Sequence, residues 1–202
     1  MIKRKKTLKV LEMKGFGEHK KSKKKSNKKI KLSKEQIISK AIQFHQKGNV
    51  PEAKKYYQYC INQGFNDHIV FSNYGIILKN LGKLEEAEKS YRKAIEIKPD
   101  FAKAHSNLGN ILKNLGKLEE AEKSYRKAIE IKPDFAQANS NLGNILKDLG
   151  KLEEAEESYR KAIKIKPDFA DAHYNLGNIF SDLGKLEEAE ESYRKAIKIK
   201  PD

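Results

Sequence analysis

Apolar and polar residues alternate along this chain with the period of an α-helix, and the whole pattern returns every 34 residues. From residue 68 onward, units begin at His68, Ala102, Ala136 and Ala170. The units that begin at Ala102 and Ala136 differ at only five of 34 positions. A unit of this size cannot bury its apolar stripes alone, so the repetition predicts a stack of units, a solenoid.

Within the unit 102–135 the pattern predicts two helices. The first spans Ala102 to Leu115, and Gly116 follows it as a left-handed glycine at a helix end would. The second spans Leu118 to Ile131 and stops before Pro133, because proline disfavours helix at the residue before it. The apolar residues recur at three- and four-residue steps, as Ala104, Leu108, Ile111, Leu112 and Leu115, then Leu118, Ala121, Tyr125, Ala128 and Ile129. We therefore expect an all-α protein of antiparallel helix pairs.

Several residues of this unit carry the signature of a known repeat. They are Leu108 with Gly109, Leu112, Ala121, Tyr125, Ala128 and Pro133, and they recur in register through four units. At this spacing the unit resembles the tetratricopeptide repeat (TPR). The large aromatic residue that usually begins the first helix is present only as Phe71, and His105, Asn139 and His173 replace it. The resemblance implies a right-handed superhelix, here of less than one full turn, whose first helices line a concave surface.

The repeat register divides the chain into six segments. We expect a disordered Lys-rich tail at 1–33, a divergent N-terminal capping unit at 34–67, and TPR units at 68–101, 102–135, 136–169 and 170–202. The capping unit has Lys40 where a leucine is expected and Phe65 where a proline is expected. The last helix pair should expose the apolar face that its neighbours bury. Three interpretations stay open: a fragment of a longer array, a homodimer through that end, and a tolerated open end.

Charge is concentrated in the tail. The formal net charge is +15, yet residues 1–33 contribute +12 of it and the rest of the chain only +3. No apolar run is long enough to cross a bilayer, and the N-terminus lacks the apolar segment of a secretory signal. The one cysteine, Cys60, permits no internal disulfide and occupies a small-residue position of the predicted core. We therefore expect a soluble, cytoplasmic protein, and Met13 is an alternative start to Met1.

The basic tail has two interpretations. Its lysine cluster comprises Lys20, Lys21, Lys23, Lys24, Lys25, Lys28 and Lys29. Such a cluster favours weak, unspecific and salt-sensitive contact with nucleic acid or an anionic membrane surface. The alternative is a solubilising extension without a function of its own.

A second stripe, made of polar residues, follows the first helix of each unit. Its members lie three or four residues apart, about 100° around the helix from the leucine stripe. They are Asn73; Lys103, Asn107, Asn110 and Asn114; Gln137, Asn141, Asn144 and Asp148; and Asp171, Asn175, Asn178 and Asp182. In the unit 68–101, Ile76 replaces the second asparagine. The TPR resemblance implies that this stripe lies inside the concave groove.

The stripe suggests a ladder for an extended peptide. Packed helices lie roughly 8–10 Å apart, and an extended chain advances about 3.3 Å per residue, so each unit should span about three residues of a bound peptide. A side-chain amide can pair with a peptide C=O and N–H together. The row Asn73, Asn107, Asn141 and Asn175 is similar to the asparagine ladder of the TPR superhelix in O-linked N-acetylglucosaminyl transferases. The alternative is that these asparagines bond each other or the neighbouring unit.

Catalytic chemistry is not indicated anywhere in the chain. We find no nucleophile with a base, no phosphate-binding loop and no metal-ligand spacing, so neither an enzyme nor a cofactor is expected. His105 and His173 are two whole units apart and are interpreted as single surface histidines. The sequence thus predicts a protein-interaction scaffold or adaptor whose partner is a protein or an extended peptide. Two alternatives are the substrate-docking part of a larger bacterial transferase and a tail-led protein associated with nucleic acid or an anionic surface.

Overall fold

A computed structural model describes residues 32–201, and the predicted tail up to residue 31 lies outside the described residues. The described part is built from α-helices, with no β-strand among residues 32–201. In chain order they are α1 (Lys34–Gln46), α2 (Val50–Asn62), α3 (His68–Asn80), α4 (Leu84–Ile97), α5 (Ala102–Asn114), α6 (Leu118–Ile131), α7 (Ala136–Asp148), α8 (Leu152–Ile165), α9 (Ala170–Asp182) and α10 (Leu186–Ile199). The odd-numbered ones are called first helices below, and the even-numbered ones second helices.

The helix ends follow from local sequence. The second helix of the unit 102–135 has the predicted bounds, and the first ends one residue early, at Asn114. Gly116 lies just beyond that end with φ +73°, a conformation that costs other residues a steric penalty. At the start of α1, Ser33 accepts from the backbone of Gln36, whose side chain accepts in return from the backbone of Ser33. This capping box fixes the beginning of the described array.

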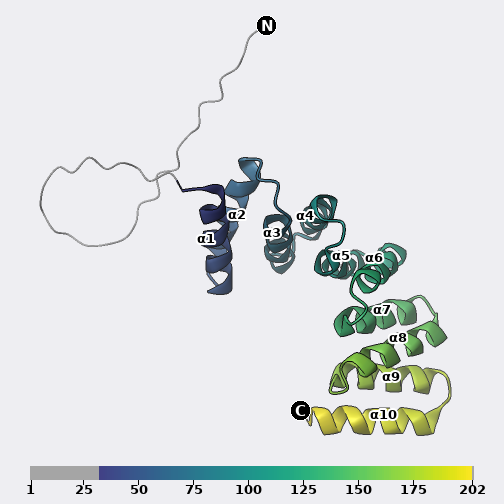
Figure 1. The fold of residues 1–202 in the computed structure, drawn as a ribbon. Coiled ribbons are helices and arrows are strands. Elements are labelled where there is room, and N and C mark those ends of the chain that lie inside the picture. Colours follow the sequence, from purple (N-terminus) through teal and green to yellow (C-terminus); the bar gives the residue numbers. More distant parts are fainter. Residues whose placement is uncertain (1–31, 202) are drawn as a thin grey trace, which may run out of the picture. The chain divides into compact units, whose positions relative to one another are not determined.

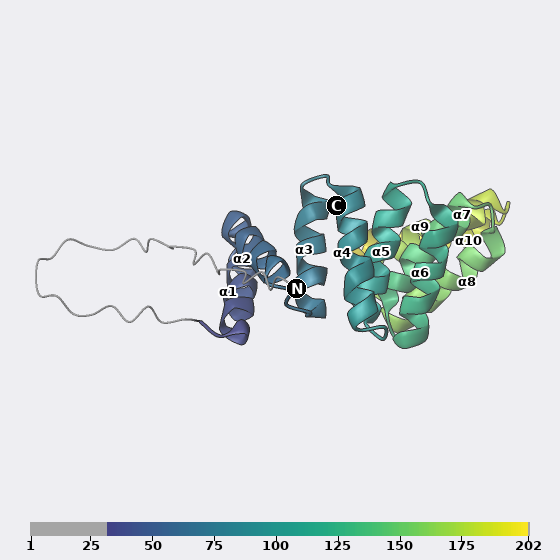
Figure 2. The same cartoon turned by 90° about the horizontal axis from the view of Figure 1, so that it is seen from above.

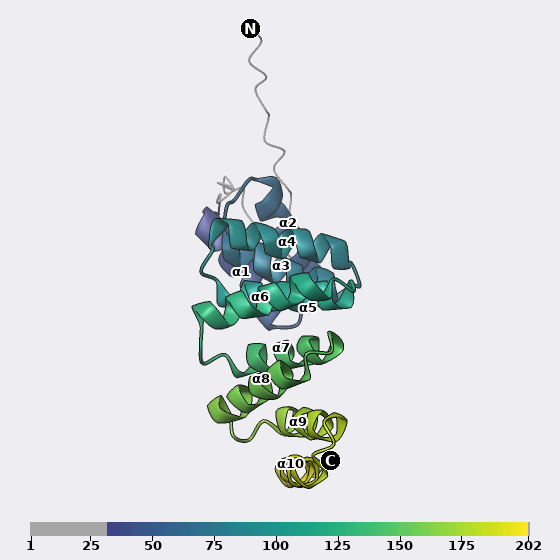
Figure 3. The same ribbon diagram turned by 90° about the vertical axis from the view of Figure 1, so that its right-hand side faces the viewer.

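Helix pairs stack in chain order, as Figures 1 and 3 show. Each first helix packs against its own second helix, and each second helix packs against the next first helix. In addition, the backbones of α5 and α7 approach each other closely, as do those of α7 and α9, whereas successive second helices within residues 32–201 are joined through long side chains. The first helices α5, α7 and α9 are therefore closely packed across the repeats. Figure 2 shows the same helix pairs from above. The predicted all-α solenoid of antiparallel helix pairs is confirmed.

A core of small, aliphatic and aromatic residues runs between the helices. In the unit 102–135, Ala104, Ala121 and Ala128 are fully buried, and Tyr125 lies among them with 1% of its surface exposed. Alanines let the helix axes approach closely, while the tyrosine fills the space between them. The apolar stripes predicted from the sequence are the faces that the pairs bury.

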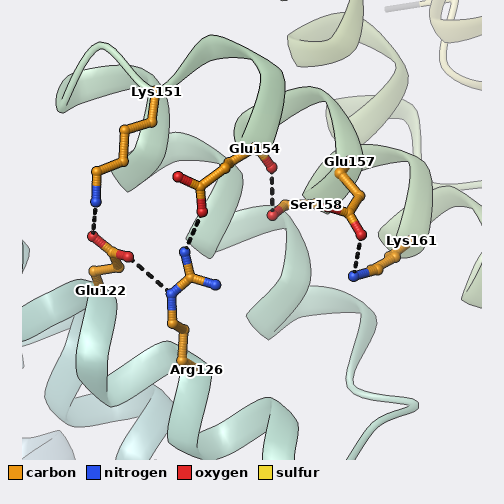
Figure 4. A network of polar contacts seen from close by, with 7 residues as sticks. All are labelled: Glu122, Arg126, Lys151, Glu154, Glu157, Ser158 and Lys161. Atoms are coloured by element: carbon orange, nitrogen blue, oxygen red, sulfur yellow. Dashed lines mark hydrogen bonds and ion pairs between the residues drawn. The ribbon is translucent and has the colours of Figure 1, made fainter.

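Ion pairs join the second helices along their outer edge. Glu122 on α6 accepts from Arg126 on the same helix and from Lys151 at the start of α8, both at 2.8 Å (Figure 4). Arg126 also donates to Glu154 on α8 at 2.6 Å. Burial disfavours the charged form of Glu122, but the hydrogen bonds from Lys151 and Arg126 outweigh it and lower its pKa. The same arrangement recurs one repeat earlier at Glu88.

Candidate functional site

Asparagines of successive first helices bond to each other across the repeat junctions. Asn141 Nδ2 on α7 donates to Asn110 Oδ1 on α5, at 3.2 Å. Asn175 Nδ2 on α9 donates to Asn144 Oδ1 on α7, also at 3.2 Å. The interpretation that asparagines bond the neighbouring unit is therefore confirmed for these two pairs. They are called the asparagine bridges below.

A tyrosine hydroxyl completes each bridge. Tyr125 donates to Asn110 Oδ1 at 2.8 Å, and Tyr159 donates to Asn144 Oδ1 at 2.7 Å. Burial raises the pKa of both phenols, so each hydroxyl keeps its proton and remains a donor. One amide oxygen thus accepts two hydrogen bonds, one from its own repeat and one from the next. In the last described repeat, Tyr193 donates to Asn178 Oδ1 at 2.9 Å.

A glycine makes this contact sterically allowed. A Cβ atom placed on Gly109 would lie 2.8 Å from ring carbons of Tyr125, closer than any real contact. The absence of a side chain at Gly109 lets the ring cross α5 and bring its hydroxyl to the adjacent Asn110. The same relation holds for Gly75, Gly143 and Gly177 with their own tyrosines. The recurring Leu-Gly-Asn sequence is therefore first of all a packing and hydrogen-bonding device.

The bridges leave one donor group unused on each supporting asparagine. The Oδ1 atoms of Asn110, Asn144 and Asn178 accept hydrogen bonds, while their Nδ2 groups make none within residues 32–201. All three side chains are half-buried on the first helices. Because each oxygen is fixed by a tyrosine, the orientation of each amide is fixed as well. The outcome is a row of oriented N–H donors, one per repeat, which we call the donor row.

The junction between the units 68–101 and 102–135 differs from the later ones. Ile76 stands where Asn110 and Asn144 stand in the next two repeats. Asn107 Nδ2 is consequently buried without a hydrogen-bond partner, and Tyr91 makes no side-chain hydrogen bond in the described part of the chain. One repeat earlier, Asn73 Nδ2 donates to Tyr57 at 3.1 Å instead.

Charged residues at the end of the stripe pair with each other. Lys113 lies 3.6 Å from Asp148, and Lys147 lies 3.0 Å from Asp182, each pair joining one first helix to the next. The negative charge of each aspartate is therefore already paired with a lysine of the preceding repeat. The other predicted members are exposed: Lys103, Asn114, Gln137 and Asp171, of which Gln137 Nε2 donates to Asn141 Oδ1 at 3.0 Å. The stripe as a peptide-binding site stays a prediction.

The remaining candidates have structural roles or lie outside the described residues. The interpretation of His173 as a surface residue is wrong, because it is 8% exposed and its Nε2 lies 2.9 Å from the carbonyl oxygen of Pro167. Cys60 is buried, and burial together with nearby Asp67 raises its pKa to about 11, which makes it a poor nucleophile. In residues 32–201 no cluster of three or more His, Cys, Asp or Glu side chains could hold a metal, and no helix there could span a membrane. The lysine cluster of the tail lies outside the described residues.

The tyrosine hydroxyls are the functional groups that sequence reasoning missed. The sequence places these tyrosines in the apolar stripe, and their rings are buried in the core as that pattern predicts. The apolar pattern does not predict which group the hydroxyl of each tyrosine bonds to. A signal was present, because the separation between Gly109 and Tyr125 is repeated by a glycine and a tyrosine in every unit from residue 68 onward. A fixed spacing between a glycine and a tyrosine indicates that the ring packs on the glycine.

Comparisons with known proteins agree with this architecture. A family model described as "TPR repeat" matches residues 75–116 and 143–183. Models described as "Tetratricopeptide repeat" match residues 102–135 and 170–202, and residues 124–157. No curated protein matches the chain as a relative.

Solved structures share the fold at low sequence identity. "MamA 41-end from Desulfovibrio magneticus RS-1" is 21% identical, with a TM-score of 0.75 over 83% of this chain and 95% of that one. "Crystal structure of YrrB: a TPR protein with an unusual peptide-binding site" is 23% identical, with a TM-score of 0.72 over 82% of this chain and 86% of that one. A pilF structure from Pseudomonas aeruginosa is 17% identical, with a TM-score of 0.73 over 82% of this chain and 75% of that one. At such identities the likeness shows the fold alone.

Proposed function

Because the chain belongs to the tetratricopeptide repeat family, we propose that it is a non-catalytic protein-interaction scaffold that binds extended polypeptide along its first helices. The observation that carries this proposal is the donor row of Asn110, Asn144 and Asn178, whose oxygens are fixed and whose N–H groups bond to nothing else within residues 32–201. A row of fixed donors at one per repeat fits the carbonyl oxygens of an extended chain. Preorganised donors bind with less loss of side-chain entropy than mobile ones.

The spacing of the donor row determines how often a bound peptide is contacted along its length. First helices in contact lie roughly 8–10 Å apart, and an extended chain covers that distance in about three residues at about 3.3 Å each. One carbonyl in every three would therefore meet an amide donor. Backbone contacts of this kind hold a peptide without reading its side chains.

The two asparagine rows then have different roles. Asn141 and Asn175 support the donor row through the bridges, and Asn107 and Asn73 extend the polar surface toward α3. The exposed Lys103 and Asp171 flank the same surface with charges of opposite sign. YrrB, a TPR protein of the same fold that is described as having a peptide-binding site, supports this proposal by analogy.

The other predicted functions have no observation in their favour among residues 32–201. The transferase-docking alternative, the resemblance to transferase repeats and the tail-led alternative stay predictions, as does the cytoplasmic location.

A donor-deleting variant tests the proposal. The triple change Asn110→Asp, Asn144→Asp and Asn178→Asp keeps an oxygen for each tyrosine while replacing the N–H donor by a negative oxygen that repels carbonyls. The probe is a short peptide, long enough to span the donor row, that is selected on the wild-type chain from a random library. Its affinity is measured by fluorescence anisotropy. We expect binding to weaken by about tenfold or more, the equivalent of one or two hydrogen bonds.

Two controls make the result interpretable. Lys123→Ala on the outer side of α6 should leave the affinity unchanged, because that side chain is exposed on a second helix. Circular dichroism should show the same helix content in the triple variant and the wild type. Equal peptide affinity in a folded triple variant would show that the donor row does not hold the peptide.

A further inference from the structure

In the repeat 34–67 the positions of the polar stripe border a cavity. The counterparts of Lys103, Asn107, Asn110 and Asn114 are Glu35, Ser39, Ile42 and Gln46. All four line one cavity of about 480 Å³, whose lining also includes Ile38 and Asp67, the residue before α3. This volume lies within the range of about 300–1,000 Å³ that is usual for ligand sites. It is called the α1 pocket below.

The floor of the α1 pocket is apolar. Ile38 and Ile42 are half-buried and pack against the core. From residue 102 onward, the place of Ile42 is taken by the three asparagines of the donor row. The α1 pocket therefore offers contact to the aliphatic part of a ligand, where the donor row offers hydrogen bonds.

The two oxygens of Asp67 have different surroundings. Asp67 Oδ1 accepts from the backbone N–H groups of Ile69 and Val70, at 2.9 and 3.1 Å, and so caps α3. Asp67 Oδ2 makes no hydrogen bond or ion pair within residues 32–201. The side chain is half-buried. A carboxylate whose orientation is fixed in this way is a preorganised acceptor for a cation.

Glu35 adds a second carboxylate at the rim of the α1 pocket. It is exposed and has no ion pair among residues 32–201. Hydrogen bonds from its own backbone N–H and from Ser33 lower its pKa, so it is ionised at neutral pH. The residues that line the pocket include no lysine or arginine. Unlike Asp148 and Asp182, which pair with lysines, these two carboxylates have no basic side chain in their own pocket.

This combination occurs at one place among residues 32–201. At the position of Asp67 the later repeats have phenylalanines, which cap no helix with their side chains: Phe101, Phe135 and Phe169. At the position of Glu35 the next two repeats have Ile69 and Lys103. A ligand group that suits the α1 pocket therefore has no equivalent place in those repeats, and its docking would fix the register of a bound chain.

We propose that the α1 pocket binds a lysine or arginine side chain of an extended peptide. The aliphatic stem lies on Ile38 and Ile42, and the cationic head meets Asp67 Oδ2 and Glu35, because long basic side chains cover apolar surface with their stems. This inference rests on the proposed function, since the same peptide reaches the donor row. The helices α1 and α5 are two repeats apart. At roughly 8–10 Å per repeat and about 3.3 Å per residue, the basic residue lies about six residues from the carbonyl at Asn110.

Peptides selected from a random library on the full chain supply the probe, and fluorescence anisotropy gives their affinities. We expect them to share a lysine or arginine. Its replacement by norleucine or citrulline, which keep the stem without the charge, should weaken binding to the wild type by about tenfold. The same replacement should have little effect on the double variant Asp67→Asn, Glu35→Gln. Asparagine can still cap α3 with its side-chain oxygen, and Glu119→Gln is the matched control that should behave as the wild type.

The outcomes separate this inference from the proposed function. Selected peptides without a shared basic residue, or an equal loss in the wild type and the double variant, overturn the α1 pocket, while sensitivity to the donor-deleting variant still supports the proposed function. Coupling to Asp67 and Glu35 without sensitivity to the donor-deleting variant supports the pocket and overturns the donor row. Failure to select any peptide overturns both. Selection that succeeds only after the lysine cluster is replaced by glutamine would make the chain's own lysines the occupant, which also overturns the inference.

Discussion

The side-chain amide of Asn141 donates a hydrogen bond to the side-chain oxygen of Asn110, 3.2 Å away in the preceding repeat. That oxygen also accepts from the hydroxyl of Tyr125, whose ring lies against Gly109. The bridge thus joins side chains from α5, α6 and α7 across one junction. Loss of one of these side chains leaves the others with unpaired polar atoms or an unfilled space.

Loss of the shared oxygen should be costly for stability. We expect Asn110→Ala to lower the free energy of unfolding by about 1–3 kcal/mol, because the Tyr125 hydroxyl and the Asn141 amide both lose their acceptor. Urea unfolding followed by circular dichroism measures this. Asn114→Ala, an exposed change on the same helix, should stay within about 0.5 kcal/mol of the wild type. Equal costs for the two variants would show that the bridge contributes nothing.

Replacing Gly109 by alanine should destabilise this protein, although the same change stabilises most helices. Alanine normally stabilises a helix relative to glycine by about 1 kcal/mol, yet Gly109→Ala places a Cβ 2.8 Å from the ring of Tyr125. We expect a net loss of about 1–3 kcal/mol from overpacking, measured by thermal unfolding. Tyr125→Leu should remove the penalty for alanine at 109, so a penalty that persists in that background would contradict the explanation.

Much of the fold was predictable because the repeat places the same residues in the same environments several times. The bounds of the second helix in the unit 102–135 and the left-handed Gly116 follow from local rules, and the structure confirms them. The burial of His173 was not predictable in the same way. Its ring reaches the carbonyl of Pro167, and that contact depends on where a loop residue lies in space.

The roles of the asparagines were only half predictable. Periodicity places Asn107, Asn110 and Asn141 on one face, but it cannot say which amide reaches a neighbouring repeat. That depends on the separation of α5 and α7 and on the ring position of Tyr125. The exception at Ile76 was visible in the sequence, yet its effect on Asn107 follows only from the bridge geometry.

Acid should weaken the outer ion pairs. Burial opposes ionisation of Glu88, Glu122 and Glu156, but hydrogen bonds from lysine and arginine lower the pKa of each below its usual value of 4.5. A lowered folded pKa means that this stabilisation is complete above about pH 4.5 and is lost as the pH falls through the folded pKa. Thermal midpoints measured from pH 7 to pH 3 should therefore fall steeply below about pH 4.5.

A matched pair of variants isolates the glutamate contribution. Glu122→Gln should lower the midpoint at pH 7 and flatten the fall in acid, since glutamine cannot be protonated. Glu119→Gln, at an exposed residue without an ion pair in the described part of the chain, should leave the profile unchanged. Profiles of equal slope for Glu122→Gln and the wild type would mean that other groups cause the acid transition.

The incomplete junction at Ile76 can be completed by one substitution. Ile76→Asn supplies an oxygen at the position from which Asn110 and Asn144 serve the later bridges, so Asn107 Nδ2 and the Tyr91 hydroxyl both gain an acceptor. Two hydrogen bonds at about 1 kcal/mol each should make this variant more stable than Ile76→Ala, which removes the same apolar side chain without replacing it. The advantage should shrink by about half in an Asn107→Ala background, as measured by urea unfolding of the four variants. An advantage of unchanged size in that background would mean that the introduced asparagine does not pair with Asn107.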